Sequence, residues 1–383
     1  MFAALTRSLR LHGTWIGQAL RPGQSAAPLT PRRVATLALG LPPYLTLQSL
    51  HWLGFALDEV LYPGYRRQRI EAPLFILGVP RSGTTFVHRT LAADPDRCTM
   101  RTWEALLAPS VSERKAWRAL IAADARLGGW GRRGIDALSR RLLGQLDAIH
   151  ETALEAAEED YLALLPAGAC FILALTFPHS AALWRLAALD RMGTAERELI
   201  VGFYRRMLQK QLYADGGQRR LLSKNAAFAT WVEALAEAFP DARFLLCIRE
   251  PEAALSSQLS AVAPGHSLLG TRPDRLYPEH FRRAYEQGYA HLRQAQRRYP
   301  ERVRVLDMAT LKQHAGSTLE RLLAELGLPA GPELQAALAA AESASRRYRS
   351  AHRHRPEHLD SPQMQADYEC LLAQEGERLR EAS

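Results

Sequence analysis

The sequence predicts an α/β fold of three layers, in which a central parallel sheet of about five strands carries helices on both faces. Two observations lead to this prediction. Short apolar runs alternate along the chain with longer segments of helical periodicity, which is typical of a parallel sheet. The first run, Leu74 to Val79, is followed by a glycine-containing loop and then by a helical segment. A strand, a loop and a helix in this order present backbone N–H groups and a helix N-terminus to a phosphate group.

An unusual N-terminal segment precedes that strand. We divide the 383 residues into an extra helical and apolar segment at 1–70 and a main domain at 71–383, with a helical insertion at about 110–215. Val34 to Ala56 contains no Asp, Glu, Lys or Arg, so its length approaches that of a membrane span. Pro42-Pro43 and several polar residues interrupt it. It is therefore predicted to form a helical hairpin or amphipathic segment that lies on a membrane surface or packs on the main domain or a partner, with a true membrane span left open.

The glycine-containing loop reads Gly78-Val-Pro-Arg-Ser-Gly-Thr-Thr-Phe86. Its glycine spacing is that of a nucleotide P-loop, in which a lysine reaches the β- and γ-phosphates. Thr84 stands where that lysine would be, which argues against ATP or GTP hydrolysis. With Arg81 inside it, the loop suits a single 5′-phosphate group, bound by the backbone amides of Ser82 to Thr85 and by the threonine hydroxyls.

The other predicted elements follow this loop. The segment Phe171 to Arg191 is predicted to be a lid or part of an acceptor pocket, and Gly265 to Pro278 to be a loop. Helices are predicted at Trp117–Glu159, Glu196–Tyr213, Ala226–Phe239, Pro251 onward, Glu279–Tyr299, Thr318–Leu326, Glu333–Ser345 and Pro362–Arg380; later strands are predicted before Arg101 and at Arg220–Asn225, Arg243–Arg249 and Val303–Met308.

Charged residues follow four of the predicted strands. Arg81, Glu104, Lys224 and Arg249 each come just after a strand. Because ligands of parallel sheets bind beyond the carboxyl ends of the strands, we expect these four side chains to share one edge of the sheet. Such an edge suits a charged ligand.

Two segments resemble a known family. The loop GVPRSGTTF is similar to the 5′-phosphosulfate loop of sulfotransferases that use 3′-phosphoadenosine 5′-phosphosulfate (PAPS). The segment Ser223 to Ser257 resembles their lysine-ended strand and their 3′-phosphate motif of an arginine and a serine. The resemblance covers roughly Ala72 to Pro356 and is closest to the large bacterial branch. It implies PAPS as co-substrate, no metal, a catalytic domain at 71–383, and PAPS contacts from Arg81, Ser82, Gly83, Thr84, Thr85, Phe86, Arg249 and Ser257.

The resemblance also implies catalytic roles. Arg81 and Lys224 would stabilise the bridging oxygen of the leaving phosphate. An acceptor hydroxyl or amine must lose a proton, and relatives place a glutamate after the second strand, which makes Glu104 the first choice of base. The spacing of Glu104 departs slightly from the tyrosylprotein branch, so His150 and His179 stay as substitutes. The resemblance places Arg349, His352 and Arg353 near the 3′-phosphate.

The acidic run Glu158-Glu159-Asp160 has two interpretations. The favoured one is a solvated helix face, because clusters of charge on helices are usually exposed. The other is a wall on the acceptor side of the sulfuryl centre.

Composition limits the partners and the compartment. The 49 Lys and Arg against 40 Asp and Glu give a net charge of +9, which suits an anionic co-substrate or lipid surface. No zinc-finger or RNA-binding motif indicates nucleic acid. Four scattered cysteines fit a reduced cytoplasmic location, peripheral to the inner membrane face if the N-terminal segment binds lipid. The acceptor is predicted to be a small molecule, lipid or glycan, and the sequence leaves the oligomeric state open.

Two alternatives to a sulfotransferase remain open from sequence. One is a P-loop-type small-molecule or nucleotide kinase, which the missing lysine disfavours. The other is a non-catalytic, membrane-associated protein that keeps the fold.

Overall fold

A five-stranded parallel sheet forms the centre of the computed structural model, which describes residues 1–23, 25–130, 133, 156–272, 276–347 and 361–381. The strand order is β2-β3-β1-β4-β5. Every neighbouring pair is parallel. The strands are β1 (Leu74–Gly78), β2 (Arg97–Cys98), β3 (Arg220–Asn225), β4 (Arg243–Ile248) and β5 (Val303–Asp307). The predicted α/β class and its five parallel strands are thus confirmed.

Both faces of the sheet are buried, which is why its strands are continuous apolar runs. In β1, Phe75 and Leu77 point into one hydrophobic cluster, and Leu74 and Ile76 point into the other. The same alternation continues in β4, as the two-residue period of a strand requires.

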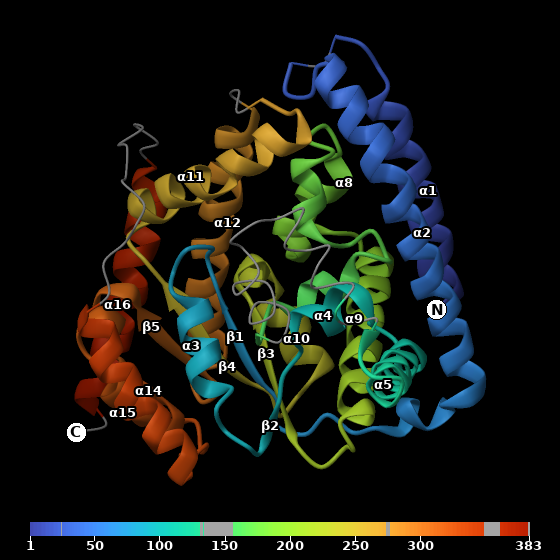
Figure 1. Cartoon of the computed structure of the whole chain (residues 1–383). Coiled ribbons are helices and arrows are strands. Elements are labelled where there is room, and N and C mark those ends of the chain that lie inside the picture. The colour runs from blue at the N-terminus through green and yellow to red at the C-terminus, as the bar shows by residue number, and fades with distance from the viewer. Residues whose placement is uncertain (24, 131–132, 134–155, 273–275, 348–360, 382–383) are drawn as a thin grey trace.

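Helices α3, α14 and α15 cover one face and helices α9, α10 and α12 lie on the other (Figure 1). The α-helices are α1 (Phe2–Ala19), α2 (Pro31–Leu61), α3 (Thr84–Leu91), α4 (Thr102–Leu107), α5 (Val111–Arg126), α8 (Ala181–Trp184), α9 (Thr194–Ala214), α10 (Val232–Ala238), α11 (Pro251–Leu269), α12 (Leu276–Arg298), α13 (Met308–Gln313), α14 (Ala315–Glu325), α15 (Pro332–Arg347) and α16 (Pro362–Glu381).

Short 3-10 helices complete the described chain. They are η1 (Pro63–Arg67), η3 (Asp160–Leu164), η4 (Phe171–Leu175), η5 (Arg185–Arg191) and η6 (Ala226–Trp231). The predicted lid segment therefore consists mainly of η4, α8 and η5.

Two helices are longer than the sequence predicts. The pair Pro42-Pro43 does not interrupt α2, which runs unbroken over 31 residues. Each proline removes one backbone donor. The carbonyls that lose these donors belong to the exposed residues Ala38 and Leu39, so water can bind them. Helix α11 likewise continues past Gly265 to Leu269, where the sequence predicted a loop, and ends at Gly270 in a left-handed conformation.

Helices α1 and α2 form an antiparallel pair along one side of the molecule (Figure 1). His12 of α1 bonds to the Tyr44 hydroxyl of α2 at 2.8 Å. The buried Arg7 donates to the Ala167 carbonyl and pairs with Glu196. The hairpin predicted within Val34–Ala56 is wrong, because all of these residues lie in the single helix α2; its partner helix α1 was not foreseen. The division at residue 70 stays a prediction. Within the described residues, no helix is long and apolar enough to cross a bilayer.

A fully buried ion pair joins α2 to α5 and α9. Lys210 Nζ lies 2.6 Å from Asp58 Oδ2, and both side chains are 0 % exposed. Burial lowers the pKa of Lys210 to about 8, and Asp58 opposes that effect. The Asp58 carboxylate also accepts from the backbone N–H groups of Val111 and Ser112 at the start of α5.

Replacing Asp58 by alanine is expected to destabilise the protein by about 3–5 kcal/mol, because Lys210 would lose its partner and would either be buried as an unpaired charge or give up its proton on folding. Urea unfolding followed by circular dichroism measures the change. The control is Glu279→Ala, which breaks an exposed pair with Arg283 and should have little effect. Equal losses in the two variants would contradict the role assigned to the buried pair.

Candidate active site

The four charged residues predicted to share one edge do follow neighbouring strands. In sheet order they are Glu104 beyond β2, Lys224 near the end of β3, Arg81 beyond β1 and Arg249 beyond β4. After β1 the chain crosses to β2 at one end of the strand order, and after β4 it continues to β5 at the other end. The direction of the connections therefore reverses between the neighbouring strands β1 and β4. Such a reversal opens a crevice in which α/β proteins bind ligands.

The loop after β1 has a backbone that only certain residues can adopt. Gly78 has φ 152°, and a Cβ there would lie 2.0 Å from the Cys247 carbonyl oxygen of β4. Gly83 has φ 89° and is the N-cap residue of α3. Arg81 takes a left-handed φ of 69°, which costs free energy for a residue with a Cβ. Strain of this kind concentrates at functional sites, so this loop is the first place to seek a ligand.

Three predicted contacts for PAPS meet at this loop. Arg81 Nε donates to Ser257 Oγ of α11 at 3.1 Å, and Arg249 Nη1 donates to the Arg81 carbonyl at 3.2 Å. Burial and the neighbouring Arg81 charge both lower the pKa of Arg249. Two guanidinium groups held this close repel each other, and an anion between them would relieve that repulsion.

Two tyrosines of α12 hold the loop in place. The Tyr285 hydroxyl donates to the Pro80 carbonyl at 2.8 Å, and the Tyr289 hydroxyl donates to the Arg249 carbonyl. Neither support is predictable from the sequence, because a spacing of four residues indicates only a buried helix face. Together they fix the loop from the side opposite α3.

The N-terminus of α3 faces the interior of the loop. Among the described residues, no side chain caps it, so its first N–H groups can bind an anion. The predicted contacts Thr84 and Thr85 are its first two residues. Ser82 Oγ donates to the Val79 carbonyl, which leaves the backbone amide of Ser82 as its contribution. Phe86 packs on the apolar cluster beneath the helix.

Lys224 is held by two of the acidic residues. Its Nζ lies 2.6 Å from Glu159 Oε1 and 3.3 Å from Glu158 Oε1. The Glu159 side chain is only 18 % exposed, and burial raises the pKa of Glu159 while Lys224 opposes that effect. The solvated-face interpretation of the acidic run is therefore wrong. An antiparallel bridge between Arg101 and Ala157 brings these residues to the sheet edge.

Asp160, the third residue of the acidic run, holds the run and the end of β3 together through buried hydrogen bonds. Its Oδ1 accepts from the Tyr204 hydroxyl at 2.9 Å and from the Asn225 amide. Burial raises the pKa of Asp160 to about 6, and these hydrogen bonds counteract it. Because Asn225 follows Lys224 directly, this network fixes the end of β3 and the lysine that it carries.

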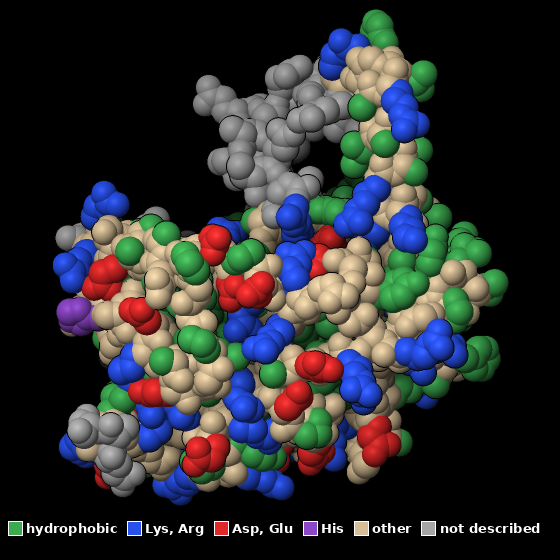
Figure 2. All heavy atoms as spheres, turned by 90° about the horizontal axis from the view of Figure 1, so that it is seen from below, with side chains coloured by type: hydrophobic (Ala, Val, Ile, Leu, Met, Phe, Trp, Pro, Cys, Tyr) green, Lys and Arg blue, Asp and Glu red, His purple; other side chains and the backbone are tan. Residues whose placement is uncertain are grey.

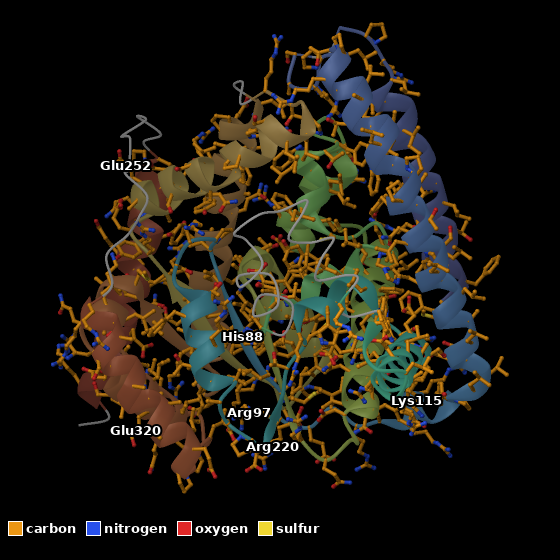
Figure 3. All side chains as sticks on the ribbon, viewed as in Figure 1. His88, Arg97, Lys115, Arg220, Glu252 and Glu320 are labelled. Carbon is orange, nitrogen blue, oxygen red and sulfur yellow. The ribbon has the colours of Figure 1, made fainter. Side chains whose placement is uncertain are left out.

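His88, labelled in Figure 3, lies on the buried side of α3, near enough to Lys224 to be affected by the lysine charge. Its Nε2 is 2.6 Å from the Thr99 hydroxyl. Burial and the Lys224 and Arg89 charges lower the pKa of His88 to about 3. A neutral His88 adds no charge beside Lys224.

Glu104 occupies a more enclosed position than Glu159. Its carboxylate accepts from the Arg101 backbone N–H at 2.9 Å, which caps α4. It also lies 3.7 Å from the buried Arg114 and accepts from Gln211. Its predicted role as base stays a prediction.

Of the two histidines predicted as substitute bases, the structure describes His179 but not His150. His179 lies beside His280 and therefore near the start of α12. His150, Arg349, His352 and Arg353 lie outside the described residues. Among the residues that the structure does describe, no group of three His, Cys, Asp or Glu side chains is arranged to hold a metal ion.

A narrow apolar cavity of about 30 Å³ adjoins the loop. Val79 and Pro80 form one wall, and Phe281 and Tyr285 of α12 form another. Phe171 of the predicted acceptor segment also lines it. The cavity therefore joins the loop to that segment with apolar surface.

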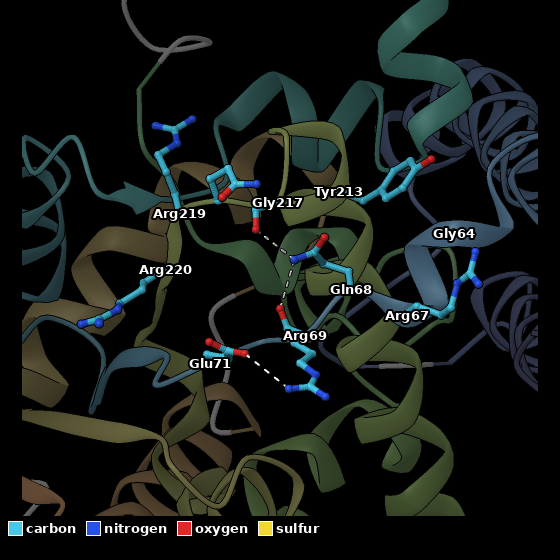
Figure 4. A pocket seen from close by; sticks show the side chains of 10 residues that line it. Gly64, Arg67, Gln68, Arg69, Glu71, Tyr213, Gly217, Arg219 and Arg220 are labelled. Carbon is cyan, nitrogen blue, oxygen red and sulfur yellow. Dashed lines mark hydrogen bonds and ion pairs between the residues drawn. The ribbon is translucent and has the colours of Figure 1, made fainter.

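A larger cleft of about 660 Å³ lies at the opposite edge of the sheet. Its lining includes Arg67 and Arg220, but these side chains point away from each other, and Arg69 pairs with Glu71 (Figure 4). The arginines do not converge on one position, so we do not place the active site there.

Comparisons with known proteins decide the family. A model described as "Sulfotransferase family" matches residues 73–333. The chain belongs to the sulfotransferase family. A search of curated proteins finds no match. The sulfotransferase fold is shared with two mycobacterial enzymes, STF9 from Mycobacterium avium (20 % identity, TM-score 0.59, 85 % of this chain and 80 % of that one) and STF1 from Mycobacterium tuberculosis H37Rv (18 %, 0.60, 84 % and 81 %).

Proposed function

We propose that this sulfotransferase moves a sulfuryl group from PAPS to a hydroxyl or amine of an amphipathic acceptor. The observation that carries the proposal is the loop after β1, where the N-terminus of α3 is capped by no described side chain and the Arg249 guanidinium donates to the Arg81 carbonyl. A 5′-phosphosulfate would bind the α3 amides, and a 3′-phosphate would bind Arg249 with Ser257 beside it. Membership of the family supports this assignment.

Lys224 and Arg81 flank the position where charge would develop. As sulfur leaves the phosphate, the bridging oxygen becomes negative, and a buried cation stabilises that charge more than water does. Lys224 is 2 % exposed and sits on the strand next to β1. In the free protein its charge is balanced by Glu158 and Glu159.

Glu159 is the better placed base, although Glu104 is the one that sequence predicts. A base must lie near the sulfur, and Glu159 is within hydrogen-bond distance of Lys224. Its raised pKa makes its carboxylate a stronger proton acceptor than an ordinary glutamate. The Glu104 carboxylate already caps α4 and faces Arg114, so we assign Glu104 to supporting the site and not to taking the proton.

The lining of the cavity beside the loop supports this acceptor class, although at about 30 Å³ the cavity itself is too small to hold an acceptor. Its lining is made of aromatic and small apolar side chains, which favour an acceptor with an apolar body next to the reacting group. No observation favours the kinase or the non-catalytic alternative.

The reaction itself tests the proposal. The protein is incubated with PAPS and a panel of phenols, long-chain alcohols and glycolipids, with chelator present. We expect release of 3′-phosphoadenosine 5′-phosphate (PAP) in step with one sulfated product, measured by mass spectrometry. Magnesium-dependent consumption of ATP, with PAPS left intact, would instead establish a kinase.

A further inference from the structure

An extended apolar surface covers the outer side of the N-terminal helices. We name it the N-terminal apolar face. Its members are hydrophobic side chains of α2 and α5 that are at least one-third exposed: Val34, Leu39, Leu50, Leu53, Leu57, Val60, Leu61, Trp117, Leu120 and Ile121. Leu39 is 78 % exposed and Val60 is 77 % exposed, at opposite ends of α2. Scattered exposed leucines need no explanation, but a contiguous row marks a site of interaction.

The face follows from the composition of α2. No charged residue lies between Val34 and Leu57, so the exposed side of the helix is mostly apolar there, with Thr46 and Ser49 as its polar members. One side packs through Leu37 and Phe55 on the protein, and the other side remains in solvent. At 31 residues the helix is about 46 Å long, more than the hydrocarbon thickness of a bilayer. A helix of this length with one exposed apolar side would lie parallel to the plane of a bilayer surface.

Helix α5 extends the face outward. It is seen almost along its axis in Figure 1 and projects from the body in the turned view of Figure 2. Trp117, Leu120 and Ile121 are exposed along it. Figure 2 also shows hydrophobic side chains on the side of the body next to this projection, with basic side chains among them. Tryptophan, leucine and basic residues in this combination are typical of helices at the membrane interface.

The exposed charges near the face are overwhelmingly basic. They are Arg10, Arg21, Arg32, Arg66, Arg67, Lys115, Arg118 and Arg126. Helix α1 has no acidic residue, and both acidic residues of α2 are engaged, Asp58 with Lys210 and Glu59 with Arg66. Helix α5 carries two, Glu113, which pairs with His51, and the half-buried Asp124. A second copy docked on this face would bring arginines toward arginines. Anionic headgroups would complement them instead.

We propose that the N-terminal apolar face docks the protein on the surface of an anionic lipid bilayer, with α2 in the plane of the interface. Apolar side chains of α2 and α5 enter the headgroup boundary and the surrounding arginines contact anionic headgroups. This proposal does not depend on the sulfuryl-transfer chemistry.

Vesicle flotation of the full chain tests the docking. We expect it to float with phosphatidylcholine vesicles that contain phosphatidylglycerol, and about tenfold less with phosphatidylcholine alone or at high salt. The double variant Leu50→Asp/Leu53→Asp should lose flotation at least about tenfold, because both residues are exposed and the change leaves the core intact. The matched control, Leu372→Asp/Ala373→Asp, adds the same charge on α16, on the other side of the molecule (Figure 1), and should float as wild type does.

Other outcomes would overturn the proposal. If the protein does not float but forms a dimer that the Leu50→Asp/Leu53→Asp variant dissociates, a second copy occupies the face. Equal flotation of this variant and the α16 control would place the lipid contact elsewhere. No flotation and no dimer would leave the face exposed without a partner. Each result is read against the circular dichroism spectrum, which shows whether the variants remain folded.

Discussion

The Lys224→Met variant is expected to lose about a thousandfold in kcat for sulfuryl transfer. Removing one preorganised donor from the position of developing charge typically costs 10² to 10³ in rate. Lys224 is 2 % exposed, so water cannot replace its charge. Without the lysine, the hydrogen bond from the Ala226 backbone still opposes the effect of burial, but the main opposing charge is gone, so the pKa of Glu159 rises further and less of it is ionised. Steady-state assays with the best acceptor of the panel measure the loss.

PAP affinity separates this catalytic role from a structural one. In Lys224→Met we expect PAP binding to change by less than about fivefold, because the 3′-phosphate and the loop amides provide most of the contacts. The control is Lys115→Met, an exposed lysine on α5 far from the loop (Figure 3), which should retain wild-type kcat. Loss of PAP binding parallel to the loss of kcat would show that Lys224 acts on folding or ground-state binding.

The second large effect is expected from Glu159→Gln, with kcat lowered by about 10²- to 10⁴-fold, the range of general base catalysis. A base must be ionised, so the wild-type rate should rise with pH through the raised pKa of Glu159 and then level off. That acid limb should disappear in the variant. The profile of kcat against pH measures both features.

Glu104→Gln is the comparison variant. We expect it to lower thermal stability, because Glu104 caps α4 and faces the buried Arg114, while keeping the acid limb. The reverse pattern, with the limb lost in Glu104→Gln and kept in Glu159→Gln, would restore Glu104 as the base and sink the assignment to Glu159.

Local signals made much of this fold predictable. The apolar runs that became β1 and β4 are buried on both faces, so they contain few polar residues to obscure the pattern. The loop was predictable because its glycines and its helix N-terminus are adjacent in sequence. Arg81, Lys224 and Arg249 were assigned to one edge from strand ends alone, and the structure brings Arg81 and Arg249 into contact.

The features that sequence missed depend on contacts between distant segments. The charge pattern around Glu159 is typical of an exposed helix. The bridge between Arg101 and Ala157, which joins segments distant in sequence, brings Glu159 into an ion pair with Lys224. The proline pair in α2 looked like a helix end because its local cost is large, but exposed carbonyls can be satisfied by water. Tyr285 and Tyr289 gave only the signal of a buried face, since the carbonyls they bind lie on other segments.

Calorimetric binding of PAP, compared with ADP and with ATP plus magnesium, tests the central claim most directly. We expect micromolar binding of PAP without magnesium, with PAP preferred over ADP by about a hundredfold because only PAP carries the 3′-phosphate. In Arg249→Ala this preference should collapse while the protein keeps its melting temperature. Equal affinities for PAP and ADP in the wild type, or binding of ATP with magnesium alone, would contradict the assignment of the loop and Arg249 to PAPS.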